Sequence, residues 1–117
     1  MKKLRVRFKL WFSTKDVEGV FGDGKWRLLQ AIGQTGSLKA ASESLNISYR
    51  KAWGDLKKAQ DNLNVTLVEK QRGGSMGGRT VLTSEGRKLL KAYTKFRADA
   101  DKQIEKAYGK YIQECLR

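Results

Sequence analysis

The sequence contains no histidine, no proline and a single cysteine, and these absences exclude several kinds of protein. Zinc and haem sites are built mainly from histidine and cysteine, and imidazole is the usual general base, so we expect no metal, no cofactor and no enzyme. The lone Cys115 cannot form an internal disulfide, as is typical of proteins in the reducing cytoplasm. No long uncharged apolar run is present, so neither a membrane-spanning helix nor a signal-peptide core is predicted.

Acidic residues are also scarce, because 12 Asp and Glu stand against 25 Lys and Arg and leave a net charge of +13. The excess is concentrated in three segments. Residues 1–11 hold five basic and no acidic groups, residues 48–79 hold seven and three, and residues 84–117 hold nine and five. A polyanionic partner is the simplest reason for such an excess. Nucleic acid is favoured over an anionic membrane, because the chain has no apolar segment to insert.

A chain of 117 residues is long enough for one domain with a modest core, and we interpret residues 1–117 as a single domain. Residues 4–12 alternate with period two, which predicts a half-buried strand. The inward face carries Leu4, Val6, Phe8, Leu10 and Phe12, and the outward face carries Arg5, Arg7, Lys9 and Trp11. A short partner strand around Val17–Phe21 would complete a hairpin over residues 4–22. Asp23 is then placed to cap a helix from about Gly24 to Gln34.

The segment Gly36–Leu63 predicts two amphipathic helices joined by a tight turn. Ser37 is positioned to cap the first helix and Ser48 the second, which runs from Tyr49 to about Leu63. The small residues Ala40 and Ala41 suit a close helix crossing. This pattern is typical of a helix-turn-helix, whose second helix enters the DNA major groove.

At 100° per residue the second helix has distinct inner and outer faces. The inner stripe consists of Ala52, Leu56, Ala59 and Leu63, bordered by Tyr49 and Trp53. The outer side consists of Arg50, Lys51, Gly54, Lys57 and Lys58. Because Gly54 has no side chain, a phosphate backbone or base edge can approach closely there. The alternative is an ordinary solvated face, since Lys and Arg usually lie outside.

Two short strands, around Thr66–Lys70 and Thr80–Thr83, are predicted on either side of the sequence RGGSMGGR. A two-stranded hairpin directly after a recognition helix is the layout of a winged helix, here over residues 23–83. Lys70, Arg72 and Arg79 flank the loop and are placed to contact backbone phosphates. The alternative is a surface hairpin that contacts nothing.

A long helix is predicted over residues 84–113, capped by Thr83 or Ser84. Its apolar residues recur at spacings of three and four: Leu89, Tyr93, Phe96, Ala100, Ile104, Ala107 and Tyr111. This seam favours a dimerisation helix that sets two recognition helices about 34–36 Å apart. The alternative is a helix that folds back on its own domain. The tryptophans Trp11, Trp26 and Trp53 are interpreted as core or rim packing.

Several motifs together resemble a known family. They are Phe21-Gly22-Asp23-Gly24, Thr35-Gly36-Ser37-Leu38 with Ala40-Ala41, Ile47-Ser48-Tyr49-Arg50-Lys51-Ala52-Trp53, Leu67-Val68-Glu69-Lys70, Gly73-Gly74 with Gly77-Gly78, and Leu82-Thr83 with Gly86. In these motifs the sequence is similar to the N-terminal domain of the ModE family of molybdate-responsive transcription regulators, which is related to LysR-type winged helices. With the flanking strand and long helix, the resemblance covers nearly the whole chain.

The resemblance implies a cytoplasmic bacterial DNA-binding regulator that forms a homodimer through its N-terminal strand region and last helix. By position, Ser48, Tyr49, Arg50 and Lys51 would face bases and phosphates. Fuller members of the family carry molybdate-binding modules after the long helix, whereas this sequence ends at Arg117. No effector-binding domain and no oxyanion site are therefore expected in these residues.

The sequence thus predicts a mainly helical winged helix-turn-helix protein with little β structure, which binds duplex DNA as a homodimer and regulates transcription. The expected DNA-binding residues are Ser37, Ser48, Tyr49, Arg50, Lys51, Gly54, Lys57, Lys58, Arg72 and Arg79. Two alternatives stay open at this stage. One is a non-specific architectural protein that binds DNA or RNA, and the other is a winged helix that binds a protein partner.

Overall fold

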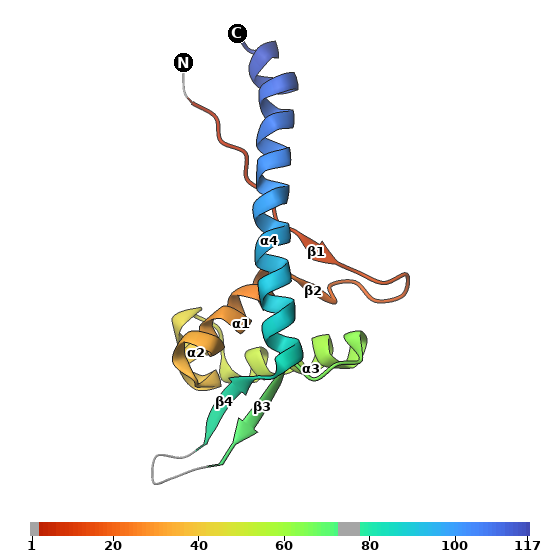
Figure 1. Cartoon of the computed structure of the whole chain (residues 1–117). Helices are drawn as coiled ribbons and strands as arrows, with labels where there is room; N and C mark the ends of the chain where they lie inside the picture. The colour runs from red at the N-terminus through yellow and green to blue at the C-terminus, as the bar shows by residue number, and fades with distance from the viewer. Residues whose placement is uncertain (1–2, 73–77) are drawn as a thin grey trace.

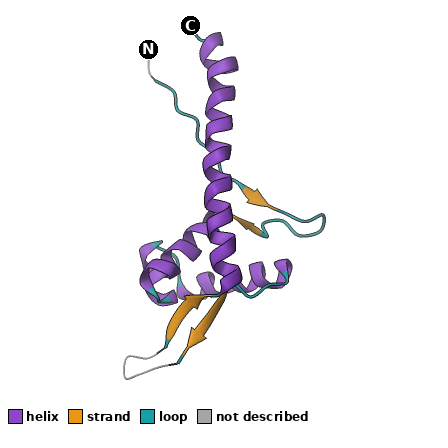
Figure 2. Cartoon of the chain, in the orientation of Figure 1, coloured by secondary structure: helices purple, strands orange, loops and turns teal. Residues whose placement is uncertain are grey.

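The computed structural model describes residues 3–72 and 78–117 (Figure 1). Helices dominate it, with two small hairpins on different sides of the molecule (Figure 2). In chain order the elements are β1 (Trp11–Phe12), β2 (Phe21–Gly22), α1 (Asp23–Thr35), α2 (Leu38–Ser44), α3 (Tyr49–Leu63), β3 (Val68–Gln71), β4 (Arg79–Leu82), α4 (Ser84–Ala107) and the π-helical segment η1 (Tyr108–Gln113). None of the helices described is both long and apolar enough to cross a membrane.

The helix-turn-helix consists of α2 and α3, and both predicted caps are present. The Ser37 hydroxyl accepts a hydrogen bond from the Ala40 N–H at 3.0 Å, and the Ser48 hydroxyl accepts one from the Lys51 N–H at 3.0 Å. Each cap satisfies a backbone donor that the first helical turn leaves unpaired. At its other end α3 stops at Asn64, which adopts the left-handed conformation that asparagine tolerates well (φ 54°).

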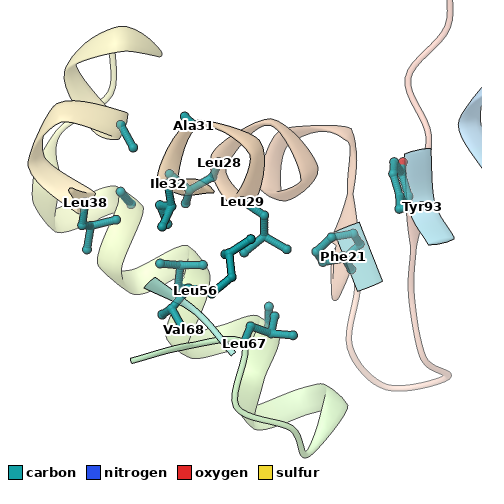
Figure 3. Close-up of a cluster of buried hydrophobic side chains, with 14 residues drawn as sticks. Phe21, Leu28, Leu29, Ala31, Ile32, Leu38, Leu56, Leu67, Val68 and Tyr93 are labelled. Atoms are coloured by element: carbon teal, nitrogen blue, oxygen red, sulfur yellow. The ribbon is translucent and has the colours of Figure 1, made fainter. Parts of the chain in front are cut away.

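A single hydrophobic cluster joins α1, α2 and α3 to the wing and to α4 (Figure 3). Its fully buried members include Leu29 and Ile32 of α1 and Leu56 of α3. Phe21 continues the cluster towards Tyr93, whose ring centroid lies 5.2 Å from its own. Burial of this apolar surface is the main force that holds α3 with one fixed side outward.

Strands β3 and β4 form the antiparallel wing, in which Lys70 pairs with Thr80. The Thr80 N–H also donates to the Gly36 carbonyl at 3.0 Å, which attaches the wing to the turn between α1 and α2. The predicted winged helix-turn-helix is therefore confirmed. Three glycines of the double-glycine motif, Gly73, Gly74 and Gly77, lie outside the described residues.

The predicted strand over residues 4–12 is wrong for most of its length. Only Trp11 and Phe12 form a ladder, and their partners, Phe21 and Gly22, overlap the predicted Val17–Phe21 strand only at Phe21. Alternation reports an extended chain, but a strand also needs a neighbour with free N–H and C=O groups. Residues 3–10 instead run beside α4, as Figure 1 shows, and Leu4 is 53% exposed.

Asp23 does not cap α1, contrary to the prediction. It is the first residue of the helix, and the N-cap position is taken by Gly22 without a side-chain hydrogen bond. The buried carboxylate accepts hydrogen bonds from the Leu10 N–H at 3.1 Å, the Tyr93 hydroxyl at 2.6 Å and Arg97 Nε at 3.0 Å. Asp23 therefore connects the N-terminal segment to α4.

Helix α4 starts at the predicted position and extends far beyond the core. Thr83 caps it by accepting from the Gly86 N–H at 2.9 Å. Gly86 allows a close contact, because a Cβ at this position would lie 2.1 Å from the Leu67 carbonyl oxygen. With η1, the helix projects from the domain and stretches the molecule to 62 × 33 × 23 Å (Figure 1). The alternative in which it folds back on its own domain is wrong.

The predicted dimerisation seam needs one correction, at Tyr93. This ring is 2% exposed and packs within its own core, so it is unavailable to a partner helix. Leu89 is half-buried and also packs against the core. Phe96 and Tyr111 are 46% and 62% exposed. Periodicity could not separate the two groups, because a core face and a dimer face share the same spacing.

Candidate nucleic-acid interface

The outer face of α3 points into solvent. Its inner side is fully closed off by Ala52, Leu56 and Ala59, each 0% exposed. Arg50, Gly54 and Lys57 lie on the opposite side, and all three are exposed. The predicted orientation of this helix is therefore confirmed. Over its first two turns, the side of α3 that faces solvent therefore carries only basic and small residues.

Gly54 leaves a gap in the middle of this face. A Cβ built on it would meet no heavy atom within 4 Å. The glycine is therefore not required for packing inside the chain. A glycine in the interior of a helix lowers helix stability by about 0.5–1 kcal/mol relative to alanine, and here it leaves open space at the surface of α3.

One flank of α3 faces away from the wing, towards α1 and the first hairpin. Here Lys51 forms an ion pair with Asp55 at 3.1 Å beside a pocket of about 470 Å³. Lys25 of α1 also lines this pocket and donates to the Gly19 carbonyl at 2.7 Å. Burial lowers the pKa of Lys25, and the nearby charges of Lys51 and Lys58 lower it further, against the opposing effect of Asp55. Lys51 and Lys58 thus lie on this flank rather than on the outermost line of the helix.

The other flank of α3 faces the wing and is aromatic. Tyr49 and Trp53 are 43% and 39% exposed. The Lys70 ammonium group donates to the Tyr49 hydroxyl at 3.1 Å and lies 5.2 Å from the Trp53 ring centroid. Trp53 therefore packs at the rim, as expected, but on the face that carries the predicted DNA-binding residues. The sequence pattern did not predict that Lys70 would contact this aromatic pair.

Arg79 brings the wing close to the start of α2. A Cβ built on Gly36 would lie 3.3 Å from the Nη2 atom of Arg79. Arg79, Ser37 and Tyr49 line one shallow pocket, which Lys39 also lines. Lys39 was not among the DNA-binding residues predicted from the sequence. Its position in the first turn of α2, beside the predicted wing, is the feature that could have identified it.

The remaining predicted positions are accessible but not clustered with this pocket. Arg72 is exposed at the end of β3, and Ser48 is exposed at the start of α3 while its hydroxyl caps the helix. Of the ten predicted residues, nine are exposed and Ser37 is half-buried. Three of them, Ser37, Tyr49 and Arg79, line the pocket beside the wing, and Lys51 lines the pocket on the hairpin flank of α3.

Comparison with known proteins agrees with this geometry. Residues 24–87 match the family described as "Bacterial regulatory helix-turn-helix protein, lysR family". The molybdenum-pterin-binding protein MopB of Rhodobacter capsulatus is 40% identical over 93 residues, which cover 77% of this chain and 34% of that protein. The transcriptional regulator ModE of Haemophilus influenzae is 37% identical over 67 residues, which cover 57% of this chain and 26% of that protein.

Among solved structures, the CbnR_DBD–DNA complex has the same fold, with a TM-score of 0.59 and 19% identity over 74% of this chain and 93% of that chain. The matched part of the chain spans between 26% and 34% of the length of the two relatives. The matched family comprises regulators and not enzymes, as the residues had led us to expect. From the match over residues 24–87 and the similarity to ModE, this chain belongs to the lysR family of bacterial regulatory helix-turn-helix proteins and is a relative of ModE.

Proposed function

We propose that this chain is a sequence-specific transcription regulator of the ModE type, which binds operator DNA as a homodimer in the bacterial cytoplasm. The observation that carries the proposal is the exposed basic face of α3, with Arg50, Gly54 and Lys57 pointing into solvent. An α-helix fits the major groove, where each base pair presents a distinct pattern of donors and acceptors.

The names of the relatives support both DNA-binding regulation and a link to molybdenum. The Haemophilus influenzae protein is named a transcriptional regulator, and CbnR_DBD was solved with DNA. MopB is named for molybdenum–pterin binding. From these names we propose that the chain regulates genes for molybdenum uptake or use.

Different residues of the domain would make different kinds of contact with DNA. Arg50 is placed to make a bidentate contact with guanine, which discriminates by about 1–3 kcal/mol against a wrong base pair. Lys57, Lys58 and Arg72 would contact phosphates and contribute affinity without reading sequence. Gly54 would let the backbone of α3 approach the groove floor.

The homodimer would form along the projecting part of α4 and the N-terminal segment beside it. The proposed contact residues are Leu89, Phe96, Ala100, Ile104, Ala107 and Tyr111. Leu89 would contribute only at the edge, because it packs on the core. A two-fold axis along α4 would place two α3 helices on one side of the duplex, about 34–36 Å apart.

The test is genomic footprinting with the purified chain, followed by titration of the recovered site against random duplex and RNA. We expect a palindromic site and a dissociation constant that rises steeply with salt, by about 0.9 log units per phosphate contact for each tenfold change. Arg50→Ala should weaken binding to the site about 5- to 150-fold and leave binding to random duplex nearly unchanged. Lys91→Ala, which removes an exposed charge from α4, is the control for net charge.

Three outcomes would contradict the proposal. Equal affinity for the recovered site and random duplex would indicate an architectural protein. Preference for RNA would indicate a different nucleic-acid target. Absence of any binding at physiological salt would indicate a module that recognises a protein partner.

A further inference from the structure

A shallow pocket of about 250 Å³ lies where the start of α2, the start of α3 and the wing meet, and we name it the notch. Its polar walls come from Ser37, Lys39, Tyr49, Lys70, Arg79 and Thr80. One water molecule takes up about 30 Å³ of liquid, so the notch has room for a tetrahedral phosphate group and its remaining hydration.

The charge of the notch is of one sign. Three cations line it, one from α2 and two from the wing, and no acidic residue is among the described residues that line it. Cations that converge from separate elements repel one another, which costs stability unless an anion is bound between them. The hydroxyl group of Ser37 adds a donor that suits phosphate oxygens.

Hydrogen bonds hold the walls of the notch together. The Thr80 N–H donates to the Gly36 carbonyl at 3.0 Å, which attaches strand β4 to the turn before α2. Ser37 is fixed by its capping bond to the Ala40 N–H. A site with fixed walls spends little of its binding energy on ordering.

Lys70 is the member of the notch that the fold holds in place. A lysine side chain is normally free to rotate, and ordering it costs up to about 2 kcal/mol. Here its ammonium group lies 3.1 Å from the Tyr49 hydroxyl and 5.2 Å from the centroid of the Trp53 ring. The hydrogen bond to Tyr49 and the cation–π contact with Trp53 leave two N–H donors for another partner.

We propose that Tyr49 and Trp53 hold the Lys70 ammonium group at the mouth of the notch, where Lys70, Lys39 and Arg79 together bind one phosphate of the DNA backbone. The inference rests on the proposed DNA-binding function and deepens it. Lys70, Lys39 and Arg79 contact the phosphate. Tyr49 and Trp53 are positioning residues for Lys70. One phosphate seated between α2, α3 and the wing sets the depth and angle at which α3 enters the major groove.

The test combines protein variants with a duplex in which single phosphates are replaced by uncharged methylphosphonates. For the unmodified chain we expect one position in each half-site at which the replacement weakens binding about tenfold or more. Lys70→Gln should weaken binding to unmodified DNA several-fold and should make that same position less sensitive to the replacement, with Lys39 and Arg79 still in contact with the phosphate. Lys91→Gln removes one exposed charge from α4 and should preserve the sensitivity of the position.

The positioning role has its own readout. Tyr49→Phe keeps the ring and removes only the hydroxyl, so we expect about two- to fivefold weaker binding in the unmodified chain. In the Lys70→Gln background the same change should have no further effect, because residues that act through one contact are not additive. Additive losses would overturn the positioning role. Both sites are exposed, so equal melting temperatures of the variants exclude a folding defect as the cause.

The inference and the proposed function fail in different ways. If the chain binds its site but no methylphosphonate position depends on Lys70, or if Lys70→Gln binds as well as Lys91→Gln, this inference alone is overturned. If the unmodified chain binds no duplex, the proposed function is overturned and this inference with it.

Discussion

Asp23 shows how one residue determines the position of a whole helix. Asp23 is 5% exposed, and its carboxylate accepts hydrogen bonds from Leu10 in the N-terminal segment and from Tyr93 and Arg97 of α4. Burial by itself raises the pKa of Asp23, but hydrogen bonds from Tyr93, Arg97 and Leu10 together lower the pKa below its ordinary value of 3.8. The ionised carboxylate is therefore the form that the fold prefers.

Replacing this carboxylate should be costly. We expect Asp23→Asn to lower the free energy of unfolding by about 3–5 kcal/mol, because it leaves the Arg97 guanidinium buried without its main partner. Urea denaturation followed by circular dichroism measures the change. Asp101→Asn removes the other carboxylate that pairs with Arg97, but this side chain is 55% exposed, so a loss below about 1 kcal/mol is expected. Equal losses in the two variants would contradict this account.

The same group predicts how stability depends on pH. A carboxyl whose pKa is lower in the folded than in the unfolded chain contributes stability fully above the unfolded value, and this contribution is lost as the pH falls through the folded value. The stability difference between the natural chain and Asp23→Asn should therefore be constant above about pH 5 and shrink below about pH 4. Urea titrations at several pH values measure it. A difference that grows on acidification would show that the sign is wrong.

At the scale of elements, α3 separates stability from function. Gly54→Ala should raise the free energy of unfolding by about 0.5–1 kcal/mol, because alanine is the better helix former and its methyl group meets nothing inside the chain. The same methyl group stands on the proposed contact face, so DNA affinity should fall. Thermal melts and a DNA titration on one preparation measure both effects. If affinity and stability rise together, Gly54 is not at the interface.

The two hairpins show why short elements depend on their surroundings. The wing has four paired residues in each strand and is attached through Thr80 to the turn before α2. The first hairpin has two paired residues in each strand, and a ribbon this short is not stable alone in water. It is held instead by the contacts of Leu10 with Asp23 and by the packing of Phe12 against Tyr93 and Phe96.

At the scale of the whole molecule, the projecting end of α4 is the main feature that a single chain does not explain. Exposed apolar side chains continue beyond α4, with Tyr111 and Ile112 of η1 at 62% and 47% and Leu116 at 48%. A helix that leaves such groups in water gains stability when a second apolar surface covers them. In the proposed homodimer, a second copy of the chain would supply that surface.

Ile104→Lys tests this assembly. It adds a charge to the proposed contact face, and we expect the dimer dissociation constant to rise about tenfold or more, because two buried isoleucines are lost. Sedimentation velocity over a concentration series measures the constant. Gln103→Lys adds the same charge to the neighbouring exposed position and should leave it nearly unchanged. Equal behaviour of the two variants would contradict the proposed dimer face.

The sequence by itself determined the features that depend on neighbours along the chain. The caps at Ser37 and Ser48, the inner and outer faces of α3 and the start of α4 all follow from hydrogen bonds and contacts within one or two helical turns. These interactions are local, so periodicity and side-chain type were enough to predict them.

Only the tertiary structure decided the features that join distant segments. It placed Asp23 beside Arg97 instead of at a cap, buried Tyr93 in the core, and brought Lys70 against the aromatic flank of α3. A spacing pattern shows which side of a helix is apolar, but it does not show what covers that side. The residues that contact one another here are far apart in the sequence, and only the packing of whole elements brings them together. No local pattern in the sequence could therefore predict these contacts.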